Sequence, residues 1–238
     1  MTKQPLWLSI YGFITLALIL LGMYLALVVS PPDANMGELI RMIFAHVAVA
    51  WVGFLAVFLS AIYAMLFLWR GNYKDDIKAV AHAEIALVFT FLTIISGMTW
   101  SKPTLGVFWD WDAKLTLTAL LASLLVGYFI VRGLLDDPER RGRISAVVMI
   151  IVLASLPFNY MAAKWFRTLH PAKSFDISSA GLSDTMSPIF RYILLFNVFV
   201  TALLYIYYFI QRNRIGQLEA EKFAKETDLD IKGDHIHV

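Results

Sequence analysis

Residues 100–116 read Trp-Ser-Lys-Pro-Thr-Leu-Gly-Val-Phe-Trp-Asp-Trp-Asp-Ala-Lys-Leu-Thr and separate two long apolar runs of the chain. The stretch holds three tryptophans, a phenylalanine and two aspartates. A connecting loop gains no stability from so much aromatic surface. At a membrane surface, aromatic side chains either anchor the protein among the lipid headgroups or present flat ring faces to a flat apolar ligand. Both interpretations place the stretch at a membrane surface.

The composition of the chain is that of a membrane protein. Its 238 residues are 59% hydrophobic and 16% charged, whereas soluble domains carry about 25% charged residues. The absence of cysteine excludes disulfides, thiolate metal sites and the Cys-x-x-Cys-His attachment site of c-type cytochromes. The net charge of +2 does not indicate a nucleic-acid partner. The first apolar run is longer than a signal-peptide core, so we expect it to be retained.

Six apolar stretches are close to the length of a membrane span, which needs about 20 residues. Because the bilayer offers no water to backbone N–H and C=O groups, each stretch is predicted to be a helix. The expected fold is therefore all-α: a polytopic integral membrane protein with one six-helix membrane domain, residues 1–211, and a tail, residues 212–238. The predicted spans cover residues 6–29, 45–69, 79–98, 115–131, 144–163 and 192–210.

The distribution of Lys and Arg predicts the orientation in the membrane. If the N-terminus is cytoplasmic, most of the 20 Lys and Arg residues fall in cytoplasmic segments, as the positive-inside rule requires. Both termini and the tail are then cytoplasmic. The Trp-rich loop, predicted to cover residues 99–114, is then periplasmic together with residues 30–44 and 164–191. These outer segments are the longer ones, so we expect function on the outer face.

The number of crossings places two histidines on the same side as the Trp-rich loop. His46 begins the second span at its outer end, and His170 follows the fifth span, whereas His82 belongs to the opposite side. Imidazole is a common axial ligand of haem iron, and Trp and Phe rings pack well against the flat macrocycle. Haem propionates need cationic partners. The cations expected on this face are Arg41, Lys102, Lys114 and Arg167.

Each of these features also has a purely structural interpretation. A single histidine at a helix end is more often structural than a metal ligand, since the side chain has many uses. Tryptophan at a membrane interface is usually an anchor. Asp110 and Asp112 precede the fourth span, where a carboxylate caps a helix, and we expect this role for Asp112. Glu84 is either functional within the membrane or solvated near the inner surface.

The stretch Phe108–Thr116, preceded by Trp100-Ser-Lys-Pro, resembles the tryptophan-rich "WWD" signature of the haem-handling proteins of cytochrome c maturation. The segments 41–47 and 168–170 resemble the two histidine-bearing segments of that family. The six-span layout is similar to its C component, the CcmC type, over all of the chain except the tail. Three positions depart from the family pattern, which usually has Gly, Trp and Arg there. These positions are Ser101, Leu105 and Lys114.

The resemblance implies a site and a set of partners. It implies that His46 and His170 are axial ligands of a non-covalently bound haem b, and that Asp112 orients the loop as a helix cap. Partners would be a periplasmic haem chaperone (CcmE type), a small membrane protein (CcmD type) and ABC transporter components (CcmA and CcmB types), all at the bacterial inner membrane. No enzymatic activity is implied. The aromatic platform and chaperone-docking surface would be Trp100, Phe108, Trp109 and Trp111.

Three alternatives remain open from the sequence. A haem exporter or synthetase of the CcsA type belongs to the same superfamily but is a longer chain with further spans. The permease subunit of an ABC-type transporter would need polar or broken helices at mid-membrane, for which Pro157 and Asn159 are the only candidates, since Asn197 is isolated. An electron-transfer enzyme would need histidine pairs within the spans. The chain has no phosphate-binding Gly-rich loop, so any ATP-driven step is expected from partners.

Overall fold

The computed structural model describes residues 4–33, 36–170 and 187–234, and side chains as far as residue 226. Six long helices cover these residues, each long and apolar enough to cross a membrane. The predicted all-α, polytopic membrane fold is therefore confirmed. A π-helical turn, η1 (Leu25–Val29), and a 3₁₀ turn, η2 (Glu38–Arg41), lie between the first two. The helices are α1 (Leu6–Tyr24), α2 (Met42–Arg70), α3 (Tyr73–Leu105), α4 (Ala113–Gly133), α5 (Pro138–Trp165) and α6 (Pro188–Asp234).

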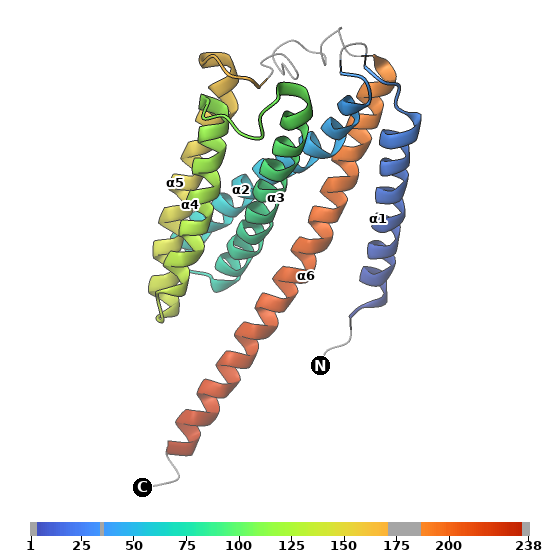
Figure 1. The fold of residues 1–238 in the computed structure, drawn as a ribbon. Coiled ribbons are helices and arrows are strands. Elements are labelled where there is room, and N and C mark those ends of the chain that lie inside the picture. The colour runs from blue at the N-terminus through green and yellow to red at the C-terminus, as the bar shows by residue number, and fades with distance from the viewer. Residues whose placement is uncertain (1–3, 34–35, 171–186, 235–238) are drawn as a thin grey trace.

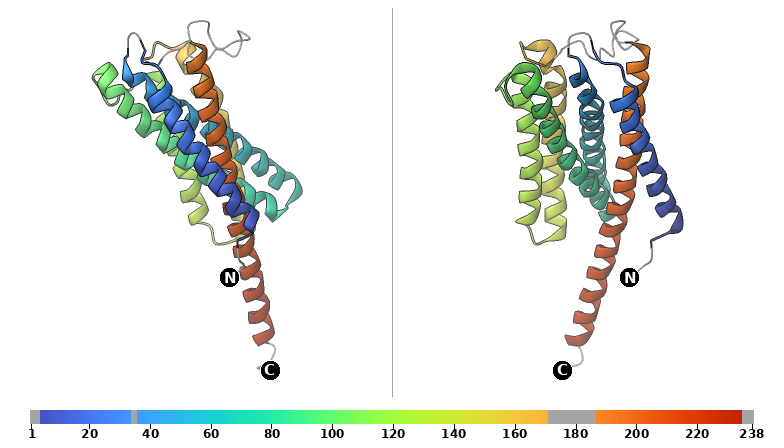
Figure 2. Two further views of the ribbon diagram at one scale, coloured as in Figure 1. Left: turned by 90° about the vertical axis from the view of Figure 1, so that its right-hand side faces the viewer. Right: turned by 45° about the vertical axis from the view of Figure 1, so that its right-hand side comes forward.

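The helices form three neighbouring pairs in one bundle (Figures 1 and 2). The hairpin of α4 and α5 lies on one side, α1 and α6 lie on the other, and α2 and α3 lie between them. Both chain ends lie at one end of the bundle, and α6 continues well beyond the other helices there. We call this the terminus end. The opposite end carries the α3–α4 connection, and we call it the loop end.

Small residues make the central contact between α2 and α3. Ala56, Ala61, Ala83 and Ala86 are all fully buried there. A Cβ added at Gly53 would lie 3.3 Å from the Phe89 Cβ, so the two backbones approach closely. Lipid tails are as apolar as the side chains, so helices in a membrane associate through such close packing rather than through the hydrophobic effect. The α2–α3 pair is thus a closely packed base for the groups at the loop end.

Helix α1 packs on α6 through small and polar residues. A Cβ at Gly12 would lie 3.0 Å from the ring of Tyr207, and the Tyr11 hydroxyl donates to the Leu203 carbonyl at 2.9 Å. Asn197 donates to the Gly22 and Ile193 carbonyls at 3.4 and 2.9 Å. Asn197 therefore serves the packing of α1 on α6.

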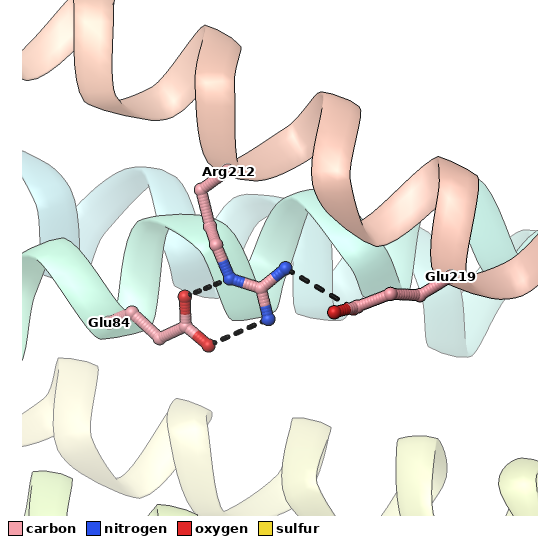
Figure 3. A network of polar contacts seen from close by, with 3 residues as sticks. All are labelled: Glu84, Arg212 and Glu219. Carbon is pink, nitrogen blue, oxygen red and sulfur yellow. Dashed lines mark hydrogen bonds and ion pairs between the residues drawn. The ribbon is translucent and has the colours of Figure 1, made fainter. Parts of the chain in front are cut away.

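Ion pairs join the helices toward the terminus end. Arg132 donates to both carboxylate oxygens of Asp76 at 2.8 Å, which joins α4 to α3. Arg212 of α6 forms a bidentate pair with Glu84 of α3 and also reaches Glu219 at 3.5 Å (Figure 3). Bidentate Arg–carboxylate pairs fix geometry as well as charge. Glu84 is thus paired with α6, and this pair holds the long α6 against the bundle.

Helices α2 to α6 begin before and end after the predicted apolar spans. The loop predicted over residues 99–114 is accordingly too long: α3 continues to Leu105, and only residues 106–112 connect it to α4. Pro103 lies in the last turn of α3 and does not stop the helix, although its ring nitrogen has no N–H to donate to the carbonyl four residues earlier. Gly106 ends the helix with φ of 81°, a left-handed conformation that glycine adopts readily.

Candidate functional site

A cavity of about 480 Å³ opens at the loop end, within the range of roughly 300–1,000 Å³ that small-molecule sites occupy. Its walls come from the start of α2, the end of α3, the α3–α4 connection, the start of α4, the end of α5 and the residues after α5. Most of the wall is apolar and includes Trp51, Phe54 and Met98. The cavity therefore offers an apolar space with a few polar groups, at the face where we expect function.

The structure brings five of the seven predicted site residues together around this cavity. They are His46, His170, Trp100, Phe108 and Trp109. The other two, Trp111 and Asp112, do not line it. Trp111 is 73% exposed and meets Trp109 edge to face, with ring centroids 5.5 Å apart. The predicted aromatic platform is thus divided between rings that line the cavity and one ring that faces outward.

His46 lies in the first turns of α2 and contacts α3 across the cavity wall. Its Nδ1 lies 2.9 Å from the Ser96 hydroxyl oxygen. A Cβ at the next residue, Gly97, would lie 3.2 Å from the His46 Cε1, so glycine leaves room for the ring. No sequence motif indicates Ser96 or Gly97. Only the packing of α2 on α3 brings them to the histidine.

His170 follows α5 in a segment whose backbone is held by neighbouring side chains. The Thr168 hydroxyl accepts from the His170 N–H at 3.2 Å and donates to the His170 carbonyl at 3.1 Å. The preceding N–H, of Leu169, donates to the Asp112 carboxylate at 2.8 Å. Because these contacts involve the backbone on both sides of the imidazole, they fix where His170 enters the cavity.

Asp112 caps α4, as the sequence predicts, and has a second role. One carboxylate oxygen accepts from the Leu115 N–H at 2.8 Å, which is the N-cap hydrogen bond. The other oxygen accepts from Leu169. Asp112 therefore connects the start of α4 to the segment that bears His170.

One of the cations predicted to serve an anionic ligand, Lys114, lies in the cavity wall. The Lys114 ammonium donates to the carbonyl and the side-chain oxygen of Asn159, at 2.8 and 2.9 Å. Asn159 is buried and donates in turn to the Thr118 hydroxyl at 3.1 Å. An ammonium has three N–H donors, so Lys114 keeps one beyond these two bonds. The sequence signals for this network are Lys114, expected as a cation on this face, and an Asn within a span.

The other cations expected to serve an anionic ligand have different neighbours. Arg41 donates to the Leu27 and Ser30 carbonyls at 2.6 and 2.8 Å and pairs with Glu38. It thus satisfies carbonyls at the end of η1. Lys102 donates to the Gly106 carbonyl at 3.0 Å and lies over the Phe108 ring. Arg41, Lys102 and Arg167 do not line the cavity, whereas Lys164, which is not among the predicted cations, does.

Two indole N–H groups at the cavity have no hydrogen-bond partner among the residues that the structure describes. They belong to Trp100 and Trp109, and both nitrogen atoms are buried. A buried donor left unpaired costs about 1–3 kcal/mol, and buried polar groups in native proteins are generally satisfied. These two donors therefore fit a ligand that brings hydrogen-bond acceptors, such as carboxylates, into the cavity.

His82 lies apart from the cavity, in the part of α3 nearer the terminus end. It is buried, its Nδ1 lies 2.6 Å from the Tyr205 hydroxyl, and its ring stacks on Phe209 at 4.0 Å between centroids. These neighbours thus provide the hydrogen-bond and stacking contacts of His82 within the bundle. The separation from His46 and His170 agrees with the side that the crossing count predicts.

Comparison with known proteins gives one consistent result. A family model described as "Heme exporter protein C" matches residues 2–227. A "Putative cytochrome c biosynthesis ccmC-like mitochondrial protein" of Marchantia polymorpha is 33% identical over 179 residues, 75% of either chain. The "Heme exporter protein C" of Bradyrhizobium diazoefficiens is 30% identical over 72% of this chain and 65% of its own. That of Escherichia coli K12 is 28% identical over 81% of this chain and 75% of its own.

Proposed function

This chain belongs to the haem exporter protein C family, and on that premise we propose that it binds haem b non-covalently and presents it to a periplasmic haem chaperone. The coarser role follows from the family: a multi-pass membrane protein in haem handling for cytochrome c biogenesis. The proposal adds three points to this role. The binding site is the cavity at the loop end, the cargo is non-covalently bound haem b, and the recipient is a chaperone of the CcmE type. No chemical reaction of the protein itself is part of it.

The observation that carries the proposal is the convergence of His46 and His170 on one apolar cavity. The two imidazoles come from α2 and from the segment after α5, so they enter the cavity from separate elements. Imidazoles are common ligands at the two axial positions of haem iron. Bound haem supplies the iron and the macrocycle, and the protein supplies binding and orientation.

The remaining groups at the cavity fit the same ligand. The rings of Trp100, Phe108 and Trp109 provide flat apolar surface for a macrocycle. The unpaired indole N–H groups and the Lys114 ammonium provide hydrogen-bond donors for propionates. Lysine offers a point charge rather than the bidentate fork of arginine, so a single contact is expected from it.

We assign the loop end to the periplasm and the terminus end to the cytoplasm of a bacterial inner membrane. The Lys and Arg distribution supports this orientation, and both chain ends lie at the end of the bundle opposite the α3–α4 connection (Figure 1). The exposed Trp111 would then face the chaperone while the other rings hold the haem. A CcmD-type protein and the CcmA- and CcmB-type transporter components would complete the assembly, and they would supply any ATP-driven step.

The permease alternative loses its candidate residues. Asn159 is used to hold Lys114 in the cavity wall, and Asn197 to pack α6 on α1. Pro157 lies within α5, which continues as a helix to Trp165. Neither asparagine marks a broken helix at mid-membrane of the kind that transporters use for substrates.

The experiment that tests the proposal is an absorption spectrum of the full chain purified from haem-replete cells. The comparison variants are His46→Ala and His170→Ala, with His82→Ala as the matched control because His82 lies outside the cavity. We expect a haem spectrum in the wild-type protein and in His82→Ala, and a lost or altered spectrum in the other two. Haem content unchanged in both cavity variants would contradict the proposal.

A further inference from the structure

We infer that Ser96 is a positioning residue for His46. The Ser96 hydroxyl holds the His46 imidazole in the tautomer that carries the proton on Nδ1 and the lone pair on Nε2. The inference rests on the proposed function, because it concerns the nitrogen that would bind the iron. Neither the sequence motifs nor the family resemblance single out Ser96. It follows from four atoms at the contact of α2 with α3.

The Ser96 hydroxyl has two kinds of neighbour. Its oxygen lies 2.7 Å from the Leu92 carbonyl oxygen and 3.1 Å from the Thr93 carbonyl oxygen, both within α3. On the other side, it lies 2.9 Å from the His46 Nδ1. A serine hydroxyl has one proton to donate and two lone pairs that accept.

The carbonyl neighbours decide where the serine proton lies. Two oxygen atoms 2.7 Å apart repel each other unless a hydrogen lies between them, and a carbonyl oxygen can only accept. The Ser96 proton is therefore directed at the Leu92 carbonyl. The hydroxyl has only lone pairs left for His46, so the His46 Nδ1 must be the donor.

The state of the other ring nitrogen follows from this donor. A neutral imidazole carries one N–H, and the nitrogen without it is the one that can bind a metal. With the proton on Nδ1, the lone pair of His46 is on Nε2. Histidines that ligate metals generally donate their second N–H to a neighbouring acceptor, which fixes both tautomer and ring orientation. Ser96 supplies such an acceptor.

Gly97 leaves room for the His46 ring in this position. A Cβ at this position would lie 3.2 Å from the His46 Cε1, the carbon that joins the two ring nitrogens. A methyl group there would press on the ring beside the metal-binding nitrogen, so glycine permits the position that Ser96 imposes. Ser96 and Gly97 together define one orientation of His46 on the closely packed α2–α3 pair.

The deciding measurement is ¹⁵N NMR of the full chain, labelled in its histidine rings and purified without haem. The chain has five histidines, and the signals lost in His46→Ala identify that residue. We expect the wild-type protein and Ser96→Thr, which keeps the hydroxyl, to show a protonated Nδ1. Ser96→Ala should show a changed tautomer ratio. A wild-type His46 protonated on Nε2, or a ratio unchanged in Ser96→Ala, overturns the inference.

Haem titration of the same proteins gives the second readout. Removing the partner of a ligating histidine typically lowers metal affinity about 10- to 100-fold, so we expect that loss in Ser96→Ala and near wild-type affinity in Ser96→Thr. Equal affinities in wild type and Ser96→Ala also overturn the inference. Failure of the wild-type protein to bind haem contradicts the proposed function instead, and the haem-free NMR spectrum still decides the tautomer. The wild-type spectrum decides it even if Ser96→Ala does not fold.

Discussion

The Asp112 carboxylate accepts a hydrogen bond from the Leu169 backbone N–H at 2.8 Å, and this bond connects two segments that are distant in the chain. Leu169 precedes His170, a proposed iron ligand, and Asp112 lies within the Trp-rich stretch, next to Trp111. The same carboxylate caps α4. A change at Asp112 is therefore expected to alter the position of His170 as well as the stability of α4.

We predict that Asp112→Ala lowers both stability and haem retention. Loss of an N-cap typically costs about 0.5–2 kcal/mol, which thermal unfolding in detergent would detect. The matched control is Asp137→Ala, because Asp137 caps α5 at the terminus end through the Arg140 N–H at 2.7 Å. Both variants should lose similar stability, but only Asp112→Ala should lose haem. Equal haem retention in the two variants would show that the Leu169 contact does not position His170.

Trp109 and Trp111 are predicted to contribute differently to haem binding. Trp109→Phe keeps an aromatic ring in the cavity and removes the buried N–H, so haem affinity should fall by up to about tenfold, the value of one hydrogen bond of 0.5–1.5 kcal/mol. Trp111→Phe is the control, since Trp111 is largely exposed and does not line the cavity. Haem titration of both variants checks the prediction. An equal loss of affinity in the two would contradict the division of the aromatic platform.

Lys114 and Asn159 are predicted to be energetically coupled. Asn159→Leu removes one acceptor of the Lys114 ammonium and leaves a partly satisfied charge in an apolar wall, at a cost of about 1–3 kcal/mol. Lys114→Met removes the charge itself. The double variant should therefore lose less stability than the sum of the single variants, as residues in one network do. Additive losses in thermal unfolding would show that the contact contributes nothing.

The orientation in the membrane can be tested with single cysteines, since the chain has none of its own. Trp111→Cys at the loop end and Leu134→Cys after α4 both replace side chains that are more than two-thirds exposed. A membrane-impermeant maleimide added to spheroplasts should label the first and not the second. The reverse pattern would place the cavity on the cytoplasmic side and remove the chaperone from the proposal.

Much of the fold can be predicted from the sequence because membrane helices depend on local composition. Each apolar run must form its own backbone hydrogen bonds, so length and hydropathy identify the helices. Their ends are less predictable, because polar residues continue a helix once it has begun. Residues 99–105 show this: they are predicted to lie in the loop, yet α3 continues through them, Pro103 included, to Leu105.

The site is predictable to the extent that it depends on the number of crossings. Counting helices places His46, the Trp-rich segment and His170 at one end. It does not give the rotation of a helix about its axis, which decides whether a side chain meets a neighbour. Ser96 and Asn159 therefore become recognisable only when α2 packs on α3 and α5 on α4. The outward direction of Trp111 likewise depends on the path of residues 106–112.

The most direct test of the central claim, that His46 and His170 bind one haem, is the EPR spectrum of the ferric protein. We expect a low-spin signal typical of two imidazole ligands in the full-length wild-type chain. His46→Gly and His170→Gly should each lose it, and added imidazole should restore it by occupying the vacated position. A wild-type signal that is high-spin, or a low-spin signal that survives both substitutions, would contradict the assignment of these two histidines as the axial pair.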